Sequence, residues 1–280
     1  MQRAIFRFVA SAVFISVGLA SLLAAAERDA NEEADGQQSR ARADQPVPQS
    51  NPLFALAHRD LLKKAKSGVI DVYFVGDSIT RRWHGNDYPS FQANWNKNFF
   101  GWNAANFGWG GDRTENVLWR LEHGELDGVN PKVIVLLIGT NNVGEAPPEG
   151  NDGALIDDVV NGIKAILGVV QQQAPNAKIV LMGITPRNAN GDTAVMPTIS
   201  RINDRIAKFA DGAKIKYLNI NEKLADREGR LYDGVTEDGL HLSTKGYQIW
   251  ADALKPIFTE WLGPPAKIDN APPATGVPQP

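Results

Sequence analysis

The sequence predicts a three-layer α/β/α sandwich built around about five parallel strands. The first observation is that, between residues 52 and 262, short apolar runs alternate with longer amphipathic segments, which is typical of βα units. The second is that the runs 133–138 and 179–184 are apolar almost throughout, like strands that are buried on both faces of a parallel sheet. The third is that polar turns containing glycine follow the runs, where α/β sheets bind their ligands.

Each predicted strand is a short apolar run. The five predicted strands are 70–75 (IDVYFV), 104–107 (AANF), 133–138 (VIVLLI), 179–184 (IVLMGI) and 217–220 (YLNI). The predicted helices are 53–66, 113–122, 154–173, 194–211 and 243–261. Segment 154–173 has the clearest pattern, because its apolar residues recur at helical spacing and Pro175 prevents continuation. We therefore expect this helix to cover one face of the sheet.

The two ends of the chain differ in composition from the middle. Residues 1–26 combine two arginines, an apolar run and a small-residue cleavage site, which predicts a signal peptide; the alternative is an uncleaved membrane anchor. Residues 27–51 are acidic and poor in large apolar side chains, which predicts a disordered linker. Residues 263–280 are rich in proline and predict a disordered tail. We expect one folded domain over 52–262 and export to the periplasm or the medium.

Composition disfavours several classes of function. A formal net charge of -3 and a pI near 5.9 give no electrostatic reason to expect nucleic acid as a partner. The chain has no cysteine, which excludes thiolate metal sites, cysteine nucleophiles and disulfides. A metal-dependent phosphoesterase would need several converging ligands, and the four histidines, His58, His84, His123 and His241, form no paired motif.

Polar turns follow three predicted strands, and a fourth precedes the last predicted helix. The turns are Gly76-Asp77-Ser78, Gly108-Trp109-Gly110-Gly111-Asp112, Gly139-Thr140-Asn141-Asn142 and Asp238-Gly239-Leu240-His241-Leu242-Ser243. Each turn alone has an ordinary explanation as a helix cap, a tight turn, a surface turn or half of a metal site. Because the carboxyl ends of parallel strands share one edge of the sheet, their joint placement predicts a single site.

Acyl transfer needs a nucleophile, a general base, a group that orients the base, and donors for the developing oxyanion. Ser78 is the candidate nucleophile, and its N–H lies at a helix amino terminus, which favours negative charge. His241 is the candidate base, and Asp238, three residues earlier, can hold its tautomer. Gly111 and Asn141 can supply further donors to the oxyanion hole.

These motifs resemble the GDSL/SGNH hydrolase family, and within it the catalytic subunits of type I platelet-activating-factor acetylhydrolase. The residues that carry the resemblance are VGDSIT (75–80), the long block 106–142 and DGLHLSTKGY (238–247). The similarity spans nearly all of 52–262 and excludes both ends of the chain.

The resemblance implies a flavodoxin-like fold and a mechanism that uses no metal and no organic cofactor. It assigns the nucleophile to Ser78, the oxyanion hole to Ser78, Gly111 and Asn141, and the rest of the triad to Asp238 and His241. Close members of the family pair up, so a homodimer is one option.

Aromatic residues near the predicted site are candidates for substrate binding. The chain has seven tryptophans, and we expect Trp83 and Trp109, with Tyr88 and Trp102, to offer flat faces to sugar rings. The alternative is that these residues only pack in the core. Trp109 is also a bulky residue in a glycine turn, where it is expected to reshape the acyl pocket, whereas Ile79 in place of the family's leucine is a minor departure.

The sequence therefore predicts an exported serine esterase that hydrolyses short-chain esters, in the first place acetyl esters, through an acyl-serine intermediate. The expected partner is a small-molecule ester, with an O-acetylated carbohydrate as the substrate and a small lipid ester as the alternative. A non-catalytic glycan-binding module is a further alternative, but it has no need of Ser78, Asn141, Asp238 and His241 together. No stable membrane insertion is expected once the signal peptide is removed.

Overall fold

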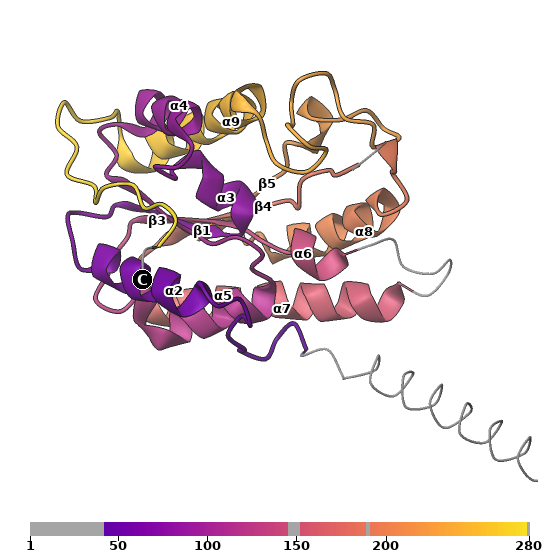
Figure 1. The fold of residues 1–280 in the computed structure, drawn as a ribbon, viewed down its shortest axis with the longest axis horizontal. Coiled ribbons are helices and arrows are strands. Elements are labelled where there is room, and N and C mark those ends of the chain that lie inside the picture. The colour runs from indigo at the N-terminus through magenta and orange to yellow at the C-terminus, as the bar shows by residue number, and fades with distance from the viewer. Residues whose placement is uncertain (1–41, 145–151, 189–190, 279–280) are drawn as a thin grey trace, which may run out of the picture. The chain divides into compact units, whose positions relative to one another are not determined.

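The computed structural model describes residues 42–144, 152–188 and 191–278. The predicted signal peptide and residues 27–41 of the predicted linker lie outside the described residues. A five-stranded parallel sheet with the strand order β2-β1-β3-β4-β5 forms the centre of the described part (Figure 1). The chain reverses its direction across the sheet between β1 and β3, and sheets of this kind bind ligands beyond the strand ends at such a point.

The observed strands coincide with the five runs that the sequence predicts. They are β1 (Val72–Gly76), β2 (Ala104–Gly108), β3 (Val133–Leu137), β4 (Lys178–Met182) and β5 (Ile215–Leu218). Every residue of β1 and β3 is buried, because these strands have a neighbour on each side and helices on each face. The predicted fold class is confirmed, and the strand ends differ from the predicted ones by at most two residues.

Helices cover both faces of the sheet (Figure 1). One face carries α2 (Phe54–Ala65), α5 (Thr114–Arg120), α7 (Gly153–Gln173) and α8 (Met196–Ile206). The other carries α3 (Ser78–Trp83), α4 (Pro89–Phe99) and α9 (Thr244–Leu262). One further turn of helix, α6 (Thr140–Val143), follows β3.

Five of these helices match predicted segments. The sequence analysis expected a helix to begin at Ser78 but gave α3 no range, and it missed α4 and α6. The helices α3 and α6 are too short to show a helical period in the sequence. The helix α4 begins with Pro89 at its first position and is rich in aromatic and asparagine residues, which are weak helix formers. None of the helices in the described part of the chain combines the length and the apolar character needed to span a bilayer.

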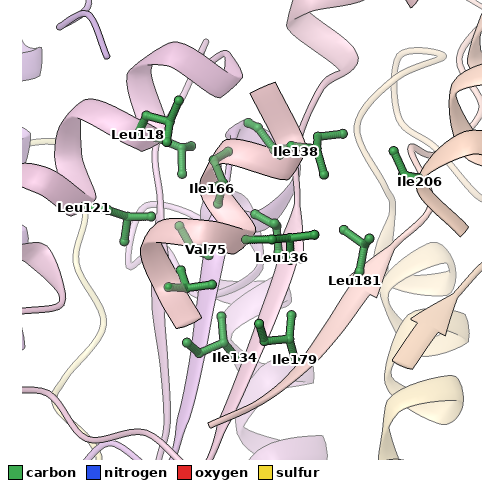
Figure 2. Packing of buried hydrophobic residues seen from close by; sticks show 14 of the residues in the cluster. Val75, Leu118, Leu121, Ile134, Leu136, Ile138, Ile166, Ile179, Leu181 and Ile206 are labelled. Atoms are coloured by element: carbon green, nitrogen blue, oxygen red, sulfur yellow. The ribbon is translucent and has the colours of Figure 1, made fainter. Parts of the chain in front are cut away.

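Two different apolar layers separate the sheet from its helices. The layer towards α5 and α7 is mainly aliphatic, and Figure 2 shows Leu118, Ile134, Leu136, Ile166 and Ile179 within it. The layer towards α3, α4 and α9 is aromatic, with Trp83, Trp95, Phe99, Trp250 and Phe258 around Phe74 of β1. Each such buried side chain contributes about 1.5–3 kcal/mol, so the two layers stabilise a chain that has no disulfide.

Residues 42–51, here called the N-terminal strap, lie against the domain. Ala43 is fully buried, and its N–H donates to the Asp158 carboxylate of α7 at 2.9 Å. The Ala43 carbonyl accepts a hydrogen bond from Thr114 Oγ1 of α5 at 2.8 Å. The prediction of a disordered linker is therefore wrong for the strap. Composition indicates only how much apolar surface a segment can bury by itself. The strap is ordered because it forms hydrogen bonds with α5 and α7.

Residues 263–278 also lie on the domain, although the sequence predicts a disordered tail. The Ala266 N–H donates to the Gly101 carbonyl at 2.9 Å, and Asp269 Oδ2 accepts from the Gly101 N–H at 2.6 Å. Proline lacks an N–H, but the residues between the prolines keep theirs and every residue keeps its carbonyl. The tail can therefore bond to the loops beside it, and the prediction of disorder is wrong for 263–278.

Candidate active site

The turn after β1 fixes the position of Ser78. Asp77 caps α3, and its Oδ1 accepts a hydrogen bond from the Ile79 N–H at 2.9 Å. Burial raises the pKa of the Asp77 carboxyl to about 7, against the hydrogen bond from Ile79, which lowers it. Ser78 is consequently the first residue of a helix, with its backbone N–H at the electropositive end.

Two glycines let α3 approach the sheet closely. A Cβ atom at Gly76 would collide with Thr80 Oγ1 of α3 and with the carbonyl oxygen of Leu137 on β3. A Cβ atom at Gly108 would collide with the backbone nitrogen of Arg81 in α3. Any larger residue at either position would push α3 away from the strand ends, and Ser78 with it.

Two polar side chains anchor α3 from either side. Tyr247 of α9 donates its hydroxyl hydrogen to the Ile79 carbonyl at 2.7 Å. Asn106 of β2 donates to the Thr80 carbonyl at 2.6 Å and accepts from the Gly108 N–H at 2.9 Å. The sequence analysis missed both positioning residues, although Asn106 was visible as a polar residue within an apolar strand.

The structure brings together the three residues predicted as the catalytic triad. Ser78 Oγ lies 2.9 Å from His241 Nε2, and His241 Nδ1 lies 2.6 Å from Asp238 Oδ2. The Asp238 Oδ1 atom also accepts from the His241 backbone N–H at 2.8 Å, which orients the carboxylate from two directions. With Nδ1 donating to Asp238, Nε2 is the acceptor that faces the serine hydroxyl.

The carboxylate of the triad is much more exposed than its histidine. The exposed fraction is 47% for the Asp238 side chain and 13% for that of His241. Burial raises the pKa of Asp238, but the hydrogen bonds from the His241 backbone and ring outweigh it, so that this pKa lies below its usual value. Arg82 adds a cation 3.7 Å from Asp238 Oδ2. Asp238 is therefore ionised at neutral pH.

The predicted oxyanion residues lie on two neighbouring turns. Gly111 has a φ of 77°, a conformation that favours glycine. Asn141 Nδ2 donates to the carbonyl of Asp112 at 2.8 Å, which joins the turn after β3 to the turn after β2. Among the described residues, none accepts a hydrogen bond from the backbone N–H of Ser78 or of Gly111. The space that a side chain at Gly110 would occupy is open, so a substrate can approach this turn.

The turn 108–112, which contains the predicted oxyanion residue Gly111, is here called the oxyanion turn. Its last residue, Asp112, belongs to a buried network of charged side chains. Arg120 donates to Asp112 through Nε at 2.8 Å and also bonds to Glu125, and all three side chains have exposed fractions of 1% or less. His58 continues the network to Glu125 at 2.8 Å. Burial raises the pKa of Asp112 to about 7, while Arg120 beside it acts to lower it. The sequence analysis missed this network, because residues 112–125 contain several charged side chains and their spacing does not show which of them are buried.

The N-terminal strap reaches the same turn. Gln49 Nε2 donates to the Gly110 carbonyl at 3.0 Å and to Asp112 Oδ1 at 2.5 Å. It is also the nearest side chain to the position that a Cβ atom of Gly111 would take, at 3.7 Å. A residue from the predicted linker thus braces the backbone that presents the Gly111 N–H.

The predicted substrate-binding role of the tryptophans is not supported by their placement. Trp83 has an exposed fraction of 0% and stacks on Tyr247 in the aromatic layer, so it offers no face to a substrate. Trp109 is 8% exposed and packs with Phe54 of α2, with the Arg81 guanidinium 5.3 Å from its ring centroid. Its ring therefore lies in the hydrophobic cluster at α2. Trp102, at 6% exposed, is buried as well.

A comparison with known protein families points to the same type of enzyme as the fold and the geometry of the site. Residues 74–249 match the model of the GDSL-like Lipase/Acylhydrolase family. The chain belongs to this family. It is a carboxylic ester hydrolase, and the glycine, serine, asparagine and histidine positions of the site all fall within the part that the family model matches.

Named relatives share this family. The chain is 30% identical to the platelet-activating factor acetylhydrolase IB subunit alpha1 of Bos taurus over 225 residues, which cover 79% of this chain and 90% of that one. It is similar to a solved structure from Streptococcus pneumonia described as a platelet activating factor, with 25% identity and a TM-score of 0.58. The match covers 72% of this chain and 90% of that one. A GDSL-like lipase from Bacteroides thetaiotaomicron, 19% identical, shares the fold with a TM-score of 0.58, covering 74% of this chain and all of its own.

Proposed function

We propose that the chain is a serine esterase that hydrolyses short-chain acyl esters, in the first place acetyl esters, through an acyl-Ser78 intermediate. The observation that carries the proposal is the continuous chain of hydrogen bonds from Ser78 Oγ through the His241 ring to Asp238, at 2.9 and 2.6 Å. Such a chain lets a neutral imidazole remove the serine proton while a carboxylate stabilises the imidazolium that forms.

In the acylation step, His241 Nε2 takes the proton of the Ser78 hydroxyl as Oγ bonds to the ester carbonyl carbon. The carbonyl oxygen becomes an oxyanion, for which the Ser78 N–H, the Gly111 N–H and the Asn141 amide are the proposed donors. The bond to the alcohol oxygen then breaks, and the protonated His241 gives its proton to the departing alcohol. Losing one oxyanion donor typically costs about 3 kcal/mol of barrier stabilisation.

In the deacylation step, water replaces the alcohol. His241 Nε2 takes a proton from this water as its oxygen bonds to the acyl carbon, and the same donors stabilise the second oxyanion. The bond from the acyl carbon to Ser78 Oγ breaks, and the serine oxygen regains its proton from His241. The products are a carboxylic acid and the free enzyme, so the chain's own residues account for every proton that moves.

The comparisons support the acyl group better than the alcohol. An acetyl group is supported by the relatives, which are named acetylhydrolases and are about 30% identical over most of both chains. For the alcohol part of the ester we propose a carbohydrate, so that the substrate is an O-acetylated carbohydrate. A lipid alcohol is the second candidate, because the same relatives are named for platelet-activating factor.

The decisive experiment compares the purified chain with its Ser78→Ala variant on aryl esters from acetate to octanoate. We expect the highest kcat/KM for acetate and a loss of turnover by more than about 10⁴ in the variant. A Ser90→Ala variant, which changes an exposed serine at the start of α4, is the control and should keep full activity. A serine-directed fluorophosphonate should label Ser78 alone. Full turnover in Ser78→Ala would remove the nucleophile from the proposal.

We further propose that residues 1–26 are a cleaved signal peptide and that the mature protein reaches the periplasm or the medium, on the support of the composition alone. Sequencing the amino terminus of the exported protein should give a start after residue 26. Recovery of the intact chain in the membrane fraction would favour the uncleaved anchor. The homodimer that the family resemblance implies is tested by sedimentation of the purified chain.

A further inference from the structure

A large cavity lies beyond the carboxyl ends of β4 and β5, at the edge of the parallel sheet where Ser78 follows β1. Its volume is about 690 Å³, which is within the range of small-molecule sites. The segments that line it follow β4 and β5 and meet α8, as the orange loops beside α8 show in Figure 1. Its lining includes Pro186, Ser200, Asp204, Asn219, Glu222 and Tyr232.

Asn188 joins this cavity to the catalytic base. Its backbone N–H donates to the carbonyl of Gly239, the residue after Asp238, at 2.9 Å. Its side-chain amide donates to the carbonyl of Gly229, which lines the cavity, at 3.4 Å. A single residue therefore contacts both the loop that carries the triad and the wall of the cavity. The cavity and the catalytic residues are therefore linked through Asn188 at one edge of the sheet.

The lining has the chemistry that recognises sugars. Tyr232 is an aromatic residue with an exposed fraction of 46%, so its ring can pack on the apolar face of a sugar ring. The exposed side chains of Ser200, Asp204, Asn219 and Glu222 offer hydroxyl, amide and carboxylate groups to sugar hydroxyls. Apolar contacts come from Pro186, Met196 and Tyr232, so the described lining combines apolar surface with hydrogen-bonding groups, as a sugar requires.

The charge of the cavity restricts the sugar further. Arg230 pairs with Asp226 and Glu228, two of the lining carboxylates. Asp204 and Glu222 form no ion pair with any residue in the described ranges, and Arg227 is the one cation among the lining residues. An excess of negative charge remains. It favours neutral or amino sugars and repels uronic acids.

From these observations we infer that the cavity binds the saccharide part of an O-acetylated, uncharged or amino oligosaccharide, with Tyr232 as its stacking platform. The inference rests on the proposed esterase function and adds to it the position of the alcohol part. It also replaces Trp83 and Trp109, which the sequence analysis chose as sugar platforms and the structure buries, by an aromatic residue that is exposed.

The test uses two substrates that share the acetyl group: 4-nitrophenyl acetate, which has no sugar, and acetylated xylo-oligosaccharide. We expect Tyr232→Ala to raise KM for the oligosaccharide about tenfold and to change kcat/KM for the aryl acetate less than twofold. Tyr232→Phe keeps the ring and should behave as the wild type. Phe100→Ala, which removes another exposed aromatic side chain (55%) outside the cavity, is the matched control and should change neither substrate.

A charge variant sharpens the test. In wild type, kcat/KM for acetylated galacturonate oligosaccharides should be at least tenfold below kcat/KM for the xylo-oligosaccharide. The double variant Asp204→Asn with Glu222→Gln should reduce this difference.

Equal effects of Tyr232→Ala on both acetate substrates, or none on the oligosaccharide, would overturn the inference. So would a wild type that hydrolyses the aryl acetate or an acetylated phospholipid but not the oligosaccharide, and the esterase proposal would then still stand. A wild type inactive on every ester would instead refute the proposed function.

Discussion

The two sides of the active site are held by different forces. On the oxyanion side, Asp112 and Glu125 have side-chain exposures of 0% and share the guanidinium of Arg120, which is 1% exposed. On the base side, Asp238 is 47% exposed and is held mainly by hydrogen bonds within its own loop. A buried carboxylate without its cation is costly, whereas water can solvate an exposed one.

This difference indicates on which side of the site a substitution should change both stability and turnover. The oxyanion turn is part of the folded core, so a change in its support should affect both stability and turnover. The loop with Asp238 and His241 is a surface element placed on that core, and a change there should affect turnover with little effect on stability.

The largest effect is expected on the base side, in catalysis alone. Asp238→Asn should lower kcat on the order of 10⁴-fold, because an amide cannot stabilise the imidazolium that forms on His241. The free energy of unfolding should change by less than about 1 kcal/mol, since the side chain is half exposed. Steady-state kinetics and urea denaturation of the same preparation measure the two effects. A variant that is unstable as well as inactive would contradict the separation.

On the oxyanion side, Arg120→Met should lower the free energy of unfolding by about 3–5 kcal/mol, because it leaves Asp112 and Glu125 buried without their cation. Arg230→Met is the matched control. It removes an arginine that also pairs with two carboxylates, but its side chain is 67% exposed, and less than about 1 kcal/mol should be lost. Similar losses in the two variants, measured by chemical denaturation, would show that burial is not the cause.

Asp77 should make stability depend on pH. Because burial raises its pKa to about 7, the folded protein keeps this proton between about pH 4 and pH 7 while the unfolded chain releases it. The free energy of unfolding contributed by this group therefore falls as the pH rises through that window, by on the order of 4 kcal/mol. Asp77→Asn should remove this part of the slope and be stabilised relative to wild type at pH 8 more than at pH 4. Parallel stability curves for the two proteins would refute the shift.

The smallest effect concerns the N-terminal strap. Gln49→Ala removes two hydrogen bonds to the oxyanion turn and should lower kcat about tenfold with KM unchanged, since a turn held less firmly presents the Gly111 N–H less well. Gln45→Ala changes an exposed strap residue whose side chain bonds to Asp44 and not to the turn, and it should leave kcat as in wild type. If both variants behave alike, the strap has no role in positioning the turn.

Much of the fold and of the candidate site could be predicted because both depend on patterns within short segments of the sequence. Apolar runs gave all five strands to within two residues, and the turn glycines marked the strand ends where Ser78, Gly111 and Asn141 lie. The placement of His241 followed from its position before the last helix. The aromatic side chains were harder, since an aromatic residue near a site in sequence can lie on either face of its helix, and Trp83 lies on the buried one.

By itself, the sequence determined the sandwich, the parallel strands and the candidate triad, because periodicity, glycine turns and hydrogen-bonding groups are properties of short segments. Only the tertiary structure decided that the strap and the tail lie on the domain, that Arg120 links Asp112 to Glu125, and that Tyr232 stands exposed at a cavity. These features depend on which surfaces meet across long stretches of chain. Burial and the pairing of charges are set by that meeting, and no local pattern contains it.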